Sequence, residues 1–162
     1  DGPQLSIPPK YIIMGCIKQS DNGGSSIISS ALKIYKHLSK KKPNLLKILK
    51  KKFFLERRGF NFPKKNILKK AIFEKRDKHF RFRYLREYIE AGYKIKNKKL
   101  KNNEIVALDY LDKLLFKKQF QKIYRLNKGD IIILNNNFLA HGRSGFKLNK
   151  GKQRSLIRIW IK

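Results

Sequence analysis

The chain has 162 residues, 41% of them hydrophobic, which is enough apolar surface for one domain with its own core. No run of about eighteen apolar residues occurs, and residues 1–4 resemble no signal peptide, so we expect neither a membrane span nor a secretory signal. The single cysteine, Cys16, excludes an intrachain disulfide and fits a reducing compartment. Together these features predict a soluble, cytoplasmic protein.

The formal net charge of +30 has two interpretations. An excess this large is typical of proteins that bind nucleic acid or another anionic surface. The lysines are scattered, however, and they accompany heavy use of Asn, Ile, Phe and Tyr, which are also encoded by A- and T-rich codons. We therefore favour drift in base composition and expect no specific nucleic-acid partner. A basic nucleic-acid-binding module is the competing class, and salt-sensitive binding to arbitrary DNA would favour it.

The N-terminal part of the chain predicts two strands followed by a helix. Residues 11–17 form an apolar run typical of a buried strand, and residues 21–24 predict a turn. A short strand at 26–28 follows. Serines at 29–30 can cap a helix that ends near the lysine run and Pro43. The apolar positions of this helix are Ala31, Leu32, Tyr35 and Leu38.

The middle of the chain combines a short helix with extended segments. Residues 45–52 predict the helix, and residues 53–58 are expected to be extended. Two further stretches, 71–76 and 79–84, alternate aromatic or apolar residues with charge. They predict a pair of strands with a turn near 77–78.

The C-terminal part predicts one substantial helix and then strands. The helix spans about residues 104–121, and its apolar face consists of Ile105, Leu108, Leu111 and Leu115. Residues 131–134 predict a fully buried strand, and a loop leads into residues 138–143. Residues 155–162 predict a closing strand. We therefore expect a single, mainly β domain with flanking helices (α+β) over residues 1–162.

The closing strand carries a chemical signal. Period-two alternation puts Arg154, Leu156, Arg158 and Trp160 on one face and three isoleucines on the other, so both faces are expected to be buried. Two inward guanidinium groups require an anionic partner, but the chain has only 11 acidic residues. Because the planar guanidinium pairs bidentately with a carboxylate, the pattern predicts a bound carboxylate.

His141 is the candidate metal ligand. It follows a predicted buried strand and is next to Gly142, so its imidazole can point into a cavity without crowding. Neutral imidazole is a good ligand for iron, although a lone histidine is more often structural. His37 and His79 lie among charged residues with no second ligand near them, and we interpret both as structural.

The order of these motifs resembles a known family. Gly129-Asp130, a buried strand, Asn135-Asn136, His141-Gly142-Arg143 and Arg154-x-x-x-Arg158 resemble the closing segment of the taurine dioxygenase-like oxygenases. Those proteins typically show G-D, a strand, D-N, H-G-R and R-x-x-x-R. The start of the chain is also similar: Asp1-Gly2-Pro3, a strand and Gly23-Gly24-Ser25-Ser26 match the family's H-x-D, strand and G-G-x-[ST] pattern.

The resemblance implies a double-stranded β-helix, or jelly roll, that lacks its N-terminal part. It implies that Asp1 and His141 ligate iron(II) together with a histidine two positions before Asp1. Arg154, helped by Ser26, would bind the distal carboxylate of 2-oxoglutarate, and Arg158 would face either that co-substrate or the substrate.

The implied activity is hydroxylation of a C–H bond in a small molecule, with O2 and 2-oxoglutarate consumed and succinate and carbon dioxide released. Arg158, Arg81 and Arg83 are candidates for the substrate side, although residues 80–86 are equally compatible with a solvated basic strand. A degenerate oxygenase-like scaffold that has lost its metal is a second alternative.

Overall fold

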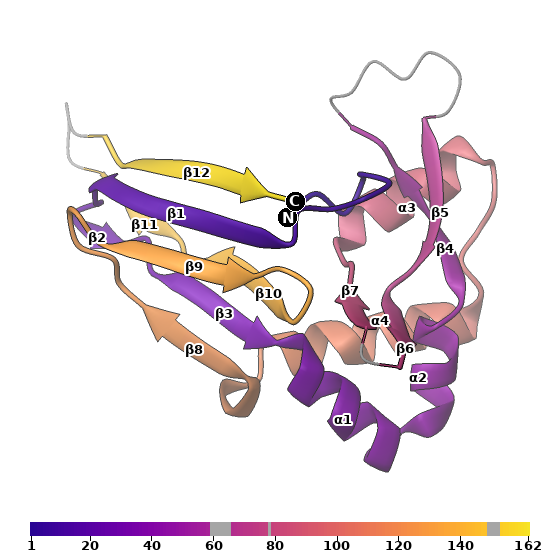
Figure 1. Cartoon of the computed structure of the whole chain (residues 1–162). Coiled ribbons are helices and arrows are strands. Elements are labelled where there is room, and N and C mark those ends of the chain that lie inside the picture. The colour runs from indigo at the N-terminus through magenta and orange to yellow at the C-terminus, as the bar shows by residue number, and fades with distance from the viewer. Residues whose placement is uncertain (59–65, 78, 149–152) are drawn as a thin grey trace.

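The computed structural model describes residues 1–58, 66–77, 79–148 and 153–162. Six of its strands form two three-stranded antiparallel sheets, seen on the left of Figure 1. One sheet has the order β12-β1-β9, with β12 at Ser155–Ile161, β1 at Tyr11–Lys18 and β9 at Ile131–Asn135. The other has the order β10-β3-β8, with β10 at Leu139–Arg143, β3 at Ser26–Ser30 and β8 at Gln121–Tyr124. A short pair, β2 (Asn22–Gly23) with β11 (Phe146–Lys147), lies beside them.

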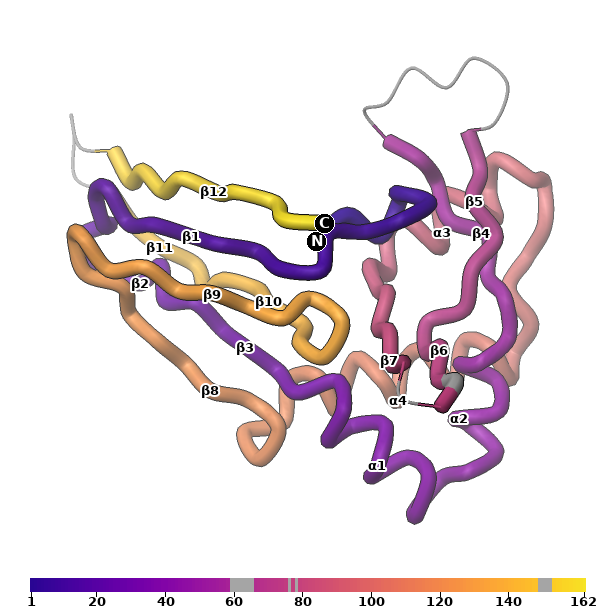
Figure 2. Tube along the Cα trace, in the orientation of Figure 1, coloured from indigo at the N-terminus to yellow at the C-terminus, as the bar shows by residue number. Residues whose placement is uncertain are grey.

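Helices and two hairpins make up the other side of the molecule (Figure 1). The helices are α1 (Ala31–Lys41), α2 (Pro43–Leu49), α3 (Arg86–Ile95) and α4 (Asn102–Leu115), followed by the 3-10 turn Lys118–Phe120. The hairpins are β4 (Lys52–Glu56) with β5 (Ile67–Ala71), and β6 (Phe73–Arg76) with β7 (His79–Phe82). Figure 2 shows that the two chain ends meet between the sheets and this helical side.

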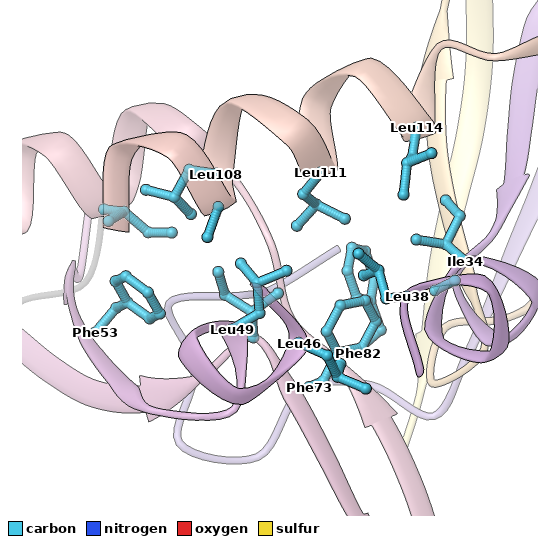
Figure 3. Close-up of a cluster of buried hydrophobic side chains, with 14 of the residues drawn as sticks. Ile34, Leu38, Leu46, Leu49, Phe53, Phe73, Phe82, Leu108, Leu111 and Leu114 are labelled. Atoms are coloured by element: carbon cyan, nitrogen blue, oxygen red, sulfur yellow. The ribbon is translucent and has the colours of Figure 1, made fainter. Parts of the chain in front are cut away.

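The larger hydrophobic core lies on the helical side. Helix α4 turns Leu108, Leu111 and Leu114 towards α1 and α2, as Figure 3 shows. The facing side chains, all buried, include Ile34, Leu38, Leu46, Leu49, Phe53, Phe73 and Phe82. A smaller core between the two sheets contains Ile12, Met14, Ile28 and Leu134. The sheets are thus fixed by one core and the helices by another.

Several predicted elements are confirmed. The strand at residues 11–17 is β1, and the strand at 26–28 extends to Ser30 as β3. Helix α1 begins behind Ser30, whose hydroxyl accepts a hydrogen bond from the backbone N–H of Lys33 at 3.2 Å. The hairpin around residues 77–78 is also present, as β6 and β7.

Other predictions are wrong. The helix expected over 104–121 ends at Leu115. Ile105, which was expected on its buried apolar face, is 36% exposed. Helix α3 and strands β5 and β8 were not predicted from the sequence.

The strands expected to be fully buried are open on one side. On β9, Leu134 is 3% exposed, whereas Ile131 is 68% exposed. On β12, Ile159 is 52% exposed, and Trp160 on the opposite face is also partly exposed. The reason is packing: the described residues cover only the inner face of β9 and leave the outer face of the β12-β1-β9 sheet to solvent.

None of the described helices is long and apolar enough to cross a membrane.

Gly92 provides a test of how α3 packs on β4. A Cβ built at Gly92 would lie 2.6 Å from the carbonyl oxygen of Phe54, so the helix approaches the strand backbone too closely for a side chain. Gly-to-Ala changes inside helices normally stabilise by about 1 kcal/mol. Here we expect Gly92→Ala to destabilise by about 1–3 kcal/mol, because the backbone contact must open. Urea denaturation measures the difference, and a gain in stability would show that α3 is not packed on β4 in this way.

Candidate active site

Asp1 and His141 meet at the mouth of a cavity. The side-chain oxygen Oδ1 of Asp1 lies 3.5 Å from Nε2 of His141, although 140 residues separate them in sequence. Both line a cavity of about 600 Å³, which is mostly apolar and includes Pro8, Phe82 and Leu139. The sequence thus brings together a carboxylate and an imidazole in a space large enough for a small organic molecule.

Asn136 holds the backbone of Asp1 in place. Its side-chain oxygen accepts a hydrogen bond from the backbone nitrogen of Asp1 at 2.8 Å. Its amide nitrogen donates to the carbonyl oxygens of Asp1 and Pro9 at 3.0 and 2.9 Å. Because Asn136 is buried and directly follows β9, the sheet fixes the position of Asp1.

Two residues of β12 orient the Asp1 carboxylate. Nη1 of Arg158 lies 3.2 and 3.1 Å from the two carboxylate oxygens, and the indole N–H of Trp160 donates to Oδ2 at 3.1 Å. These side chains belong to the same face of β12, as the alternation predicted. Arg158 therefore contacts Asp1 but is not itself one of the residues that line the cavity.

The imidazole of His141 is neutral at physiological pH. Its side chain is 11% exposed. Burial is the main cause that lowers its pKa from 6.5 to about 4, and the positive charge of Arg158 acts in the same direction. A neutral imidazole keeps the ring lone pair that a metal ligand needs. Strand β10 fixes the residue by pairing with β3, where His141 is opposite Ile28.

Arg154 and Ser26 lie farther from this pair. Arg154 donates from Nε to the side-chain oxygen of Gln19 at 2.9 Å and from Nη2 to the carbonyl oxygen of Gly24 at 3.1 Å. Ser26 is buried on β3, two residues after Gly24. Neither side chain lines the cavity that contains Asp1 and His141, whereas Arg158 contacts Asp1 directly.

Arg143 is a neighbour of Arg154 at the ring of Phe146. The guanidinium groups of Arg143 and Arg154 lie 4.3 and 5.7 Å from the ring centre of Phe146. Burial and the charge of Arg143 both lower the pKa of Arg154. Among the described residues, neither guanidinium has a carboxylate within ion-pair distance. Two guanidinium groups beside one ring repel each other, and a bound anion would stabilise both.

The two arginines proposed for the substrate side are placed differently. The guanidinium of Arg83 is buried and donates to the carbonyl oxygens of Pro3 and Leu5 at 2.7 and 2.5 Å. Burial lowers its pKa to about 10, so it stays charged at neutral pH. Arg83 lines the Asp1 cavity but is occupied in holding residues 3–6, whereas Arg81 lines a different cavity.

Sequence reasoning missed a polar group on the cavity wall. The hydroxyl of Tyr84 donates to Oδ1 of Asp112 at 2.5 Å, and Nη1 of Arg86 contacts Oδ2 of Asp112 at 3.1 Å. All three residues line the cavity. Asp112 is four residues from Leu108 on α4, so helical spacing could have placed it near the core-facing side. No signal in the sequence indicated that Tyr84 and Arg86 would meet it.

The match to a family model decides the family. The model for taurine catabolism dioxygenases of the TauD, TfdA family matches residues 1–160. The chain belongs to this family. FR-33289 synthase of Streptomyces rubellomurinus is 26% identical, and the match covers 98% of this chain and 49% of that protein.

Solved structures agree with the TauD, TfdA fold. An asparagine oxygenase in complex with Fe(II), 3-hydroxyasparagine and succinate matches with a TM-score of 0.75 at 14% identity, covering 99% of this chain and 48% of the other. The protein AAD-2, in complex with Mn(II) and N-oxalylglycine, matches with a TM-score of 0.69 at 14% identity, covering 99% and 66%. The predicted α+β jelly roll is confirmed. The chain spans about half the length of FR-33289 synthase and of the asparagine oxygenase.

The donor set fits part of an iron site in a TauD, TfdA protein. No group of three or more His, Cys, Asp or Glu side chains that could hold a metal occurs within residues 1–58, 66–77, 79–148 and 153–162. Asp1 and His141 supply one oxygen and one neutral nitrogen at 3.5 Å from each other, which are ligand types that non-haem iron(II) uses. The pair therefore fits as two ligands of three.

Proposed function

We propose that the protein is an iron(II)- and 2-oxoglutarate-dependent oxygenase that hydroxylates an unactivated C–H bond of a small molecule. The observation that carries the proposal is the pairing of a buried, neutral His141 with the Asp1 carboxylate at one cavity. Membership of the TauD, TfdA family supports it. We treat residues 1–162 as part of one catalytic domain and place it in the cytoplasm, in keeping with the single, buried thiol of Cys16.

Asp1 and His141 would hold the iron. A third ligand, a histidine two positions before Asp1, completes the facial triad in this proposal. The bound iron would supply activation of O2, with 2-oxoglutarate oxidised to succinate and carbon dioxide. The neighbouring residues would position the Asp1 ligand. Asn136 fixes the Asp1 backbone, and Arg158 and Trp160 fix the Asp1 carboxylate. Such partners of a ligand typically change metal affinity by about 10–100-fold when removed.

Arg154 and Arg143 would bind the distal carboxylate of 2-oxoglutarate. The support is physical: two guanidinium groups share the ring of Phe146 without a carboxylate among the described residues. Ser26, buried beside Gly24, would add its hydroxyl. Arg158 already binds Asp1 and is 51% exposed, and in this proposal it would also face either the co-substrate or the substrate.

Arg154→Met tests the co-substrate site. Because a charge-assisted hydrogen bond contributes about 1.5–3 kcal/mol, the concentration of 2-oxoglutarate needed for half-maximal succinate formation should rise roughly 10–100-fold. Arg154→Lys keeps the charge but loses the fork, and it should fall between the wild type and Arg154→Met. Titration of 2-oxoglutarate measures the effect. An unchanged requirement in Arg154→Met would remove this residue from the co-substrate site.

The substrate would occupy the apolar cavity beyond His141. Its volume of about 600 Å³ suits a small organic molecule, and the Tyr84–Asp112–Arg86 group offers the polar contact on the cavity wall. Arg83 would not bind the substrate directly, because its guanidinium holds the loop of residues 3–6. The proposed substrate is therefore a small molecule and not a polymer.

The deciding experiment measures succinate formation by the protein expressed with its native upstream sequence. Succinate should form only when iron(II), 2-oxoglutarate and O2 are all present, and slow formation is expected even without the substrate. No iron-dependent succinate, together with a residue other than histidine two positions before Asp1, would support the degenerate scaffold. A screen of small molecules for those that accelerate succinate release then identifies the substrate.

A further inference from the structure

A second cavity lies away from the active-site cavity. Its volume is about 570 Å³, and it is bounded by the β4–β5 and β6–β7 hairpins and by Asn137. None of its lining residues also lines the cavity of Asp1 and His141. Whatever occupies it would bind separately from the oxygenase site.

This cavity concentrates positive charge. Six of its 12 lining residues are lysine or arginine, whereas these types make up 41 of the 162 residues of the chain. The six are Lys50, Lys52, Lys69, Lys70, Lys75 and Arg81, and His79 lies among them. Lysine and arginine thus supply half of the cavity lining, and they come from α2, β4, β5, β6 and β7 or directly follow those elements.

Both hairpins contribute cations to the cavity lining. Strand pairing puts Lys52 opposite Ala71 and Lys70 opposite Phe53, at the end of the β4–β5 hairpin that adjoins β6. The β6–β7 hairpin puts Arg81 opposite Glu74. Because directly opposite residues share a face of a sheet, Lys52 and Lys70 lie on opposite faces of this hairpin, and both line the cavity at the end of the hairpin.

The protein supplies little negative charge to this cavity. Glu74 is the single carboxylate among the lining residues. Within the part of the chain that the structure describes, no carboxylate lies within ion-pair distance of the five lysines or of Arg81. The ammonium groups of Lys69 and Lys75 instead lie over the rings of Phe54 and Tyr35, at 5.3 and 5.7 Å. The cavity therefore has several cations whose counter-charge must come from outside.

We propose that this cavity, the hairpin cleft, binds a small organic polyphosphate. Lysine ammonium groups bind phosphate as point charges, and several of them suit a chain of phosphates. The apolar part of the lining, which includes Phe73 and Phe80, suits an organic moiety. A volume of about 570 Å³ is within the range of small-molecule sites, whereas nucleic-acid surfaces are extended basic stripes.

Calorimetry with ATP as the probe tests the proposal on this chain. The variant Lys52→Gln, Lys70→Gln, Lys75→Gln removes three charges from the cleft. The control Lys18→Gln, Lys128→Gln, Lys147→Gln removes three exposed charges at the far end of the sheets, so both proteins lose the same net charge. Circular dichroism should show both to be folded, since the lysines replaced are at the surface or cleft wall.

The cleft variant should bind ATP at least about tenfold more weakly than the wild type, and the control should stay close to the wild type. Competition by inorganic triphosphate would show that phosphates supply the recognition and supports the proposal. Equal weakening in both variants would attribute binding to net charge and overturn it. Tight binding of a single-stranded oligonucleotide without binding of ATP would also overturn it, in favour of a nucleic-acid surface.

Discussion

His141→Ala is expected to weaken iron(II) binding by more than about 100-fold and to abolish succinate formation. Removing a residue that merely orients a ligand costs about 10–100-fold in affinity, so removing a ligand itself should cost more. Nε2 of His141 lies 3.5 Å from the Asp1 carboxylate, and burial keeps the imidazole neutral. No other described side chain is placed to replace it.

The measurement is a titration of iron(II) under anaerobic conditions, followed by the succinate assay. His37→Ala is the matched control, because His37 lies on α1 with its ring 5.4 Å from that of Phe120 and lines neither cavity. It should bind iron as the wild type does. If His141→Ala retained wild-type affinity, the iron would have to bind elsewhere, and the proposed function would lose its central observation.

The contact between Asp1 and His141, which defines the candidate site, could be predicted from sequence motifs more readily than the fold around it. The His141-Gly142-Arg143 motif and the Asp1 start are short signals of fixed chemistry, and the structure brings Asp1 and His141 into contact. That contact arises because Asn136 ties Asp1 to the end of β9, next to β10. The sequence contains the residues of the candidate site. The hydrogen bond between Asp1 and Asn136, however, depends on the pairing of β1 with β9, which are far apart in the sequence.

The basic stretch at residues 80–86 shows why alternation can mislead. Continued alternation would put Arg81 and Arg83 on one face, and both were therefore candidates for the substrate side. Strand β7 ends at Phe82, so Arg83 leaves the strand geometry and its side chain turns to the carbonyl oxygens of Pro3 and Leu5. The two arginines then face different cavities. Where a strand ends depends on tertiary contacts that periodicity does not record.

Helix α3 was missed for a related reason. It contains Gly92, a poor helix former, and its first residue follows Leu85, which makes no side-chain cap. The glycine is required by the close approach to Phe54, so a residue that looks like a helix breaker is a packing requirement here. The outer face of β9 gives the opposite case: Ile131 and Ile133 look buried in sequence, yet the described residues leave them exposed.

Leu111→Ala is expected to lower the free energy of unfolding by roughly 2–5 kcal/mol, the range for leucine in a closed core. Leu111 is fully buried on α4, and it faces the side chains of α1 and α2 across the larger core. Its loss would leave a cavity between three helices, and the surrounding leucines can fill it only by moving those helices. Denaturation with urea, followed by circular dichroism, measures the difference.

Ile105→Ala is the matched control, because it removes an aliphatic side chain from the same helix. Sequence periodicity put both residues on one apolar face, which predicts similar losses. The structure instead leaves Ile105 36% exposed, so its replacement should cost well under 1 kcal/mol, with the better helix propensity of alanine offsetting part of the loss. Equal losses in the two variants would mean that α4 is rotated from the orientation described. A large difference would fix that rotation, and with it the position of Asp112 on the wall of the cavity that contains Asp1 and His141.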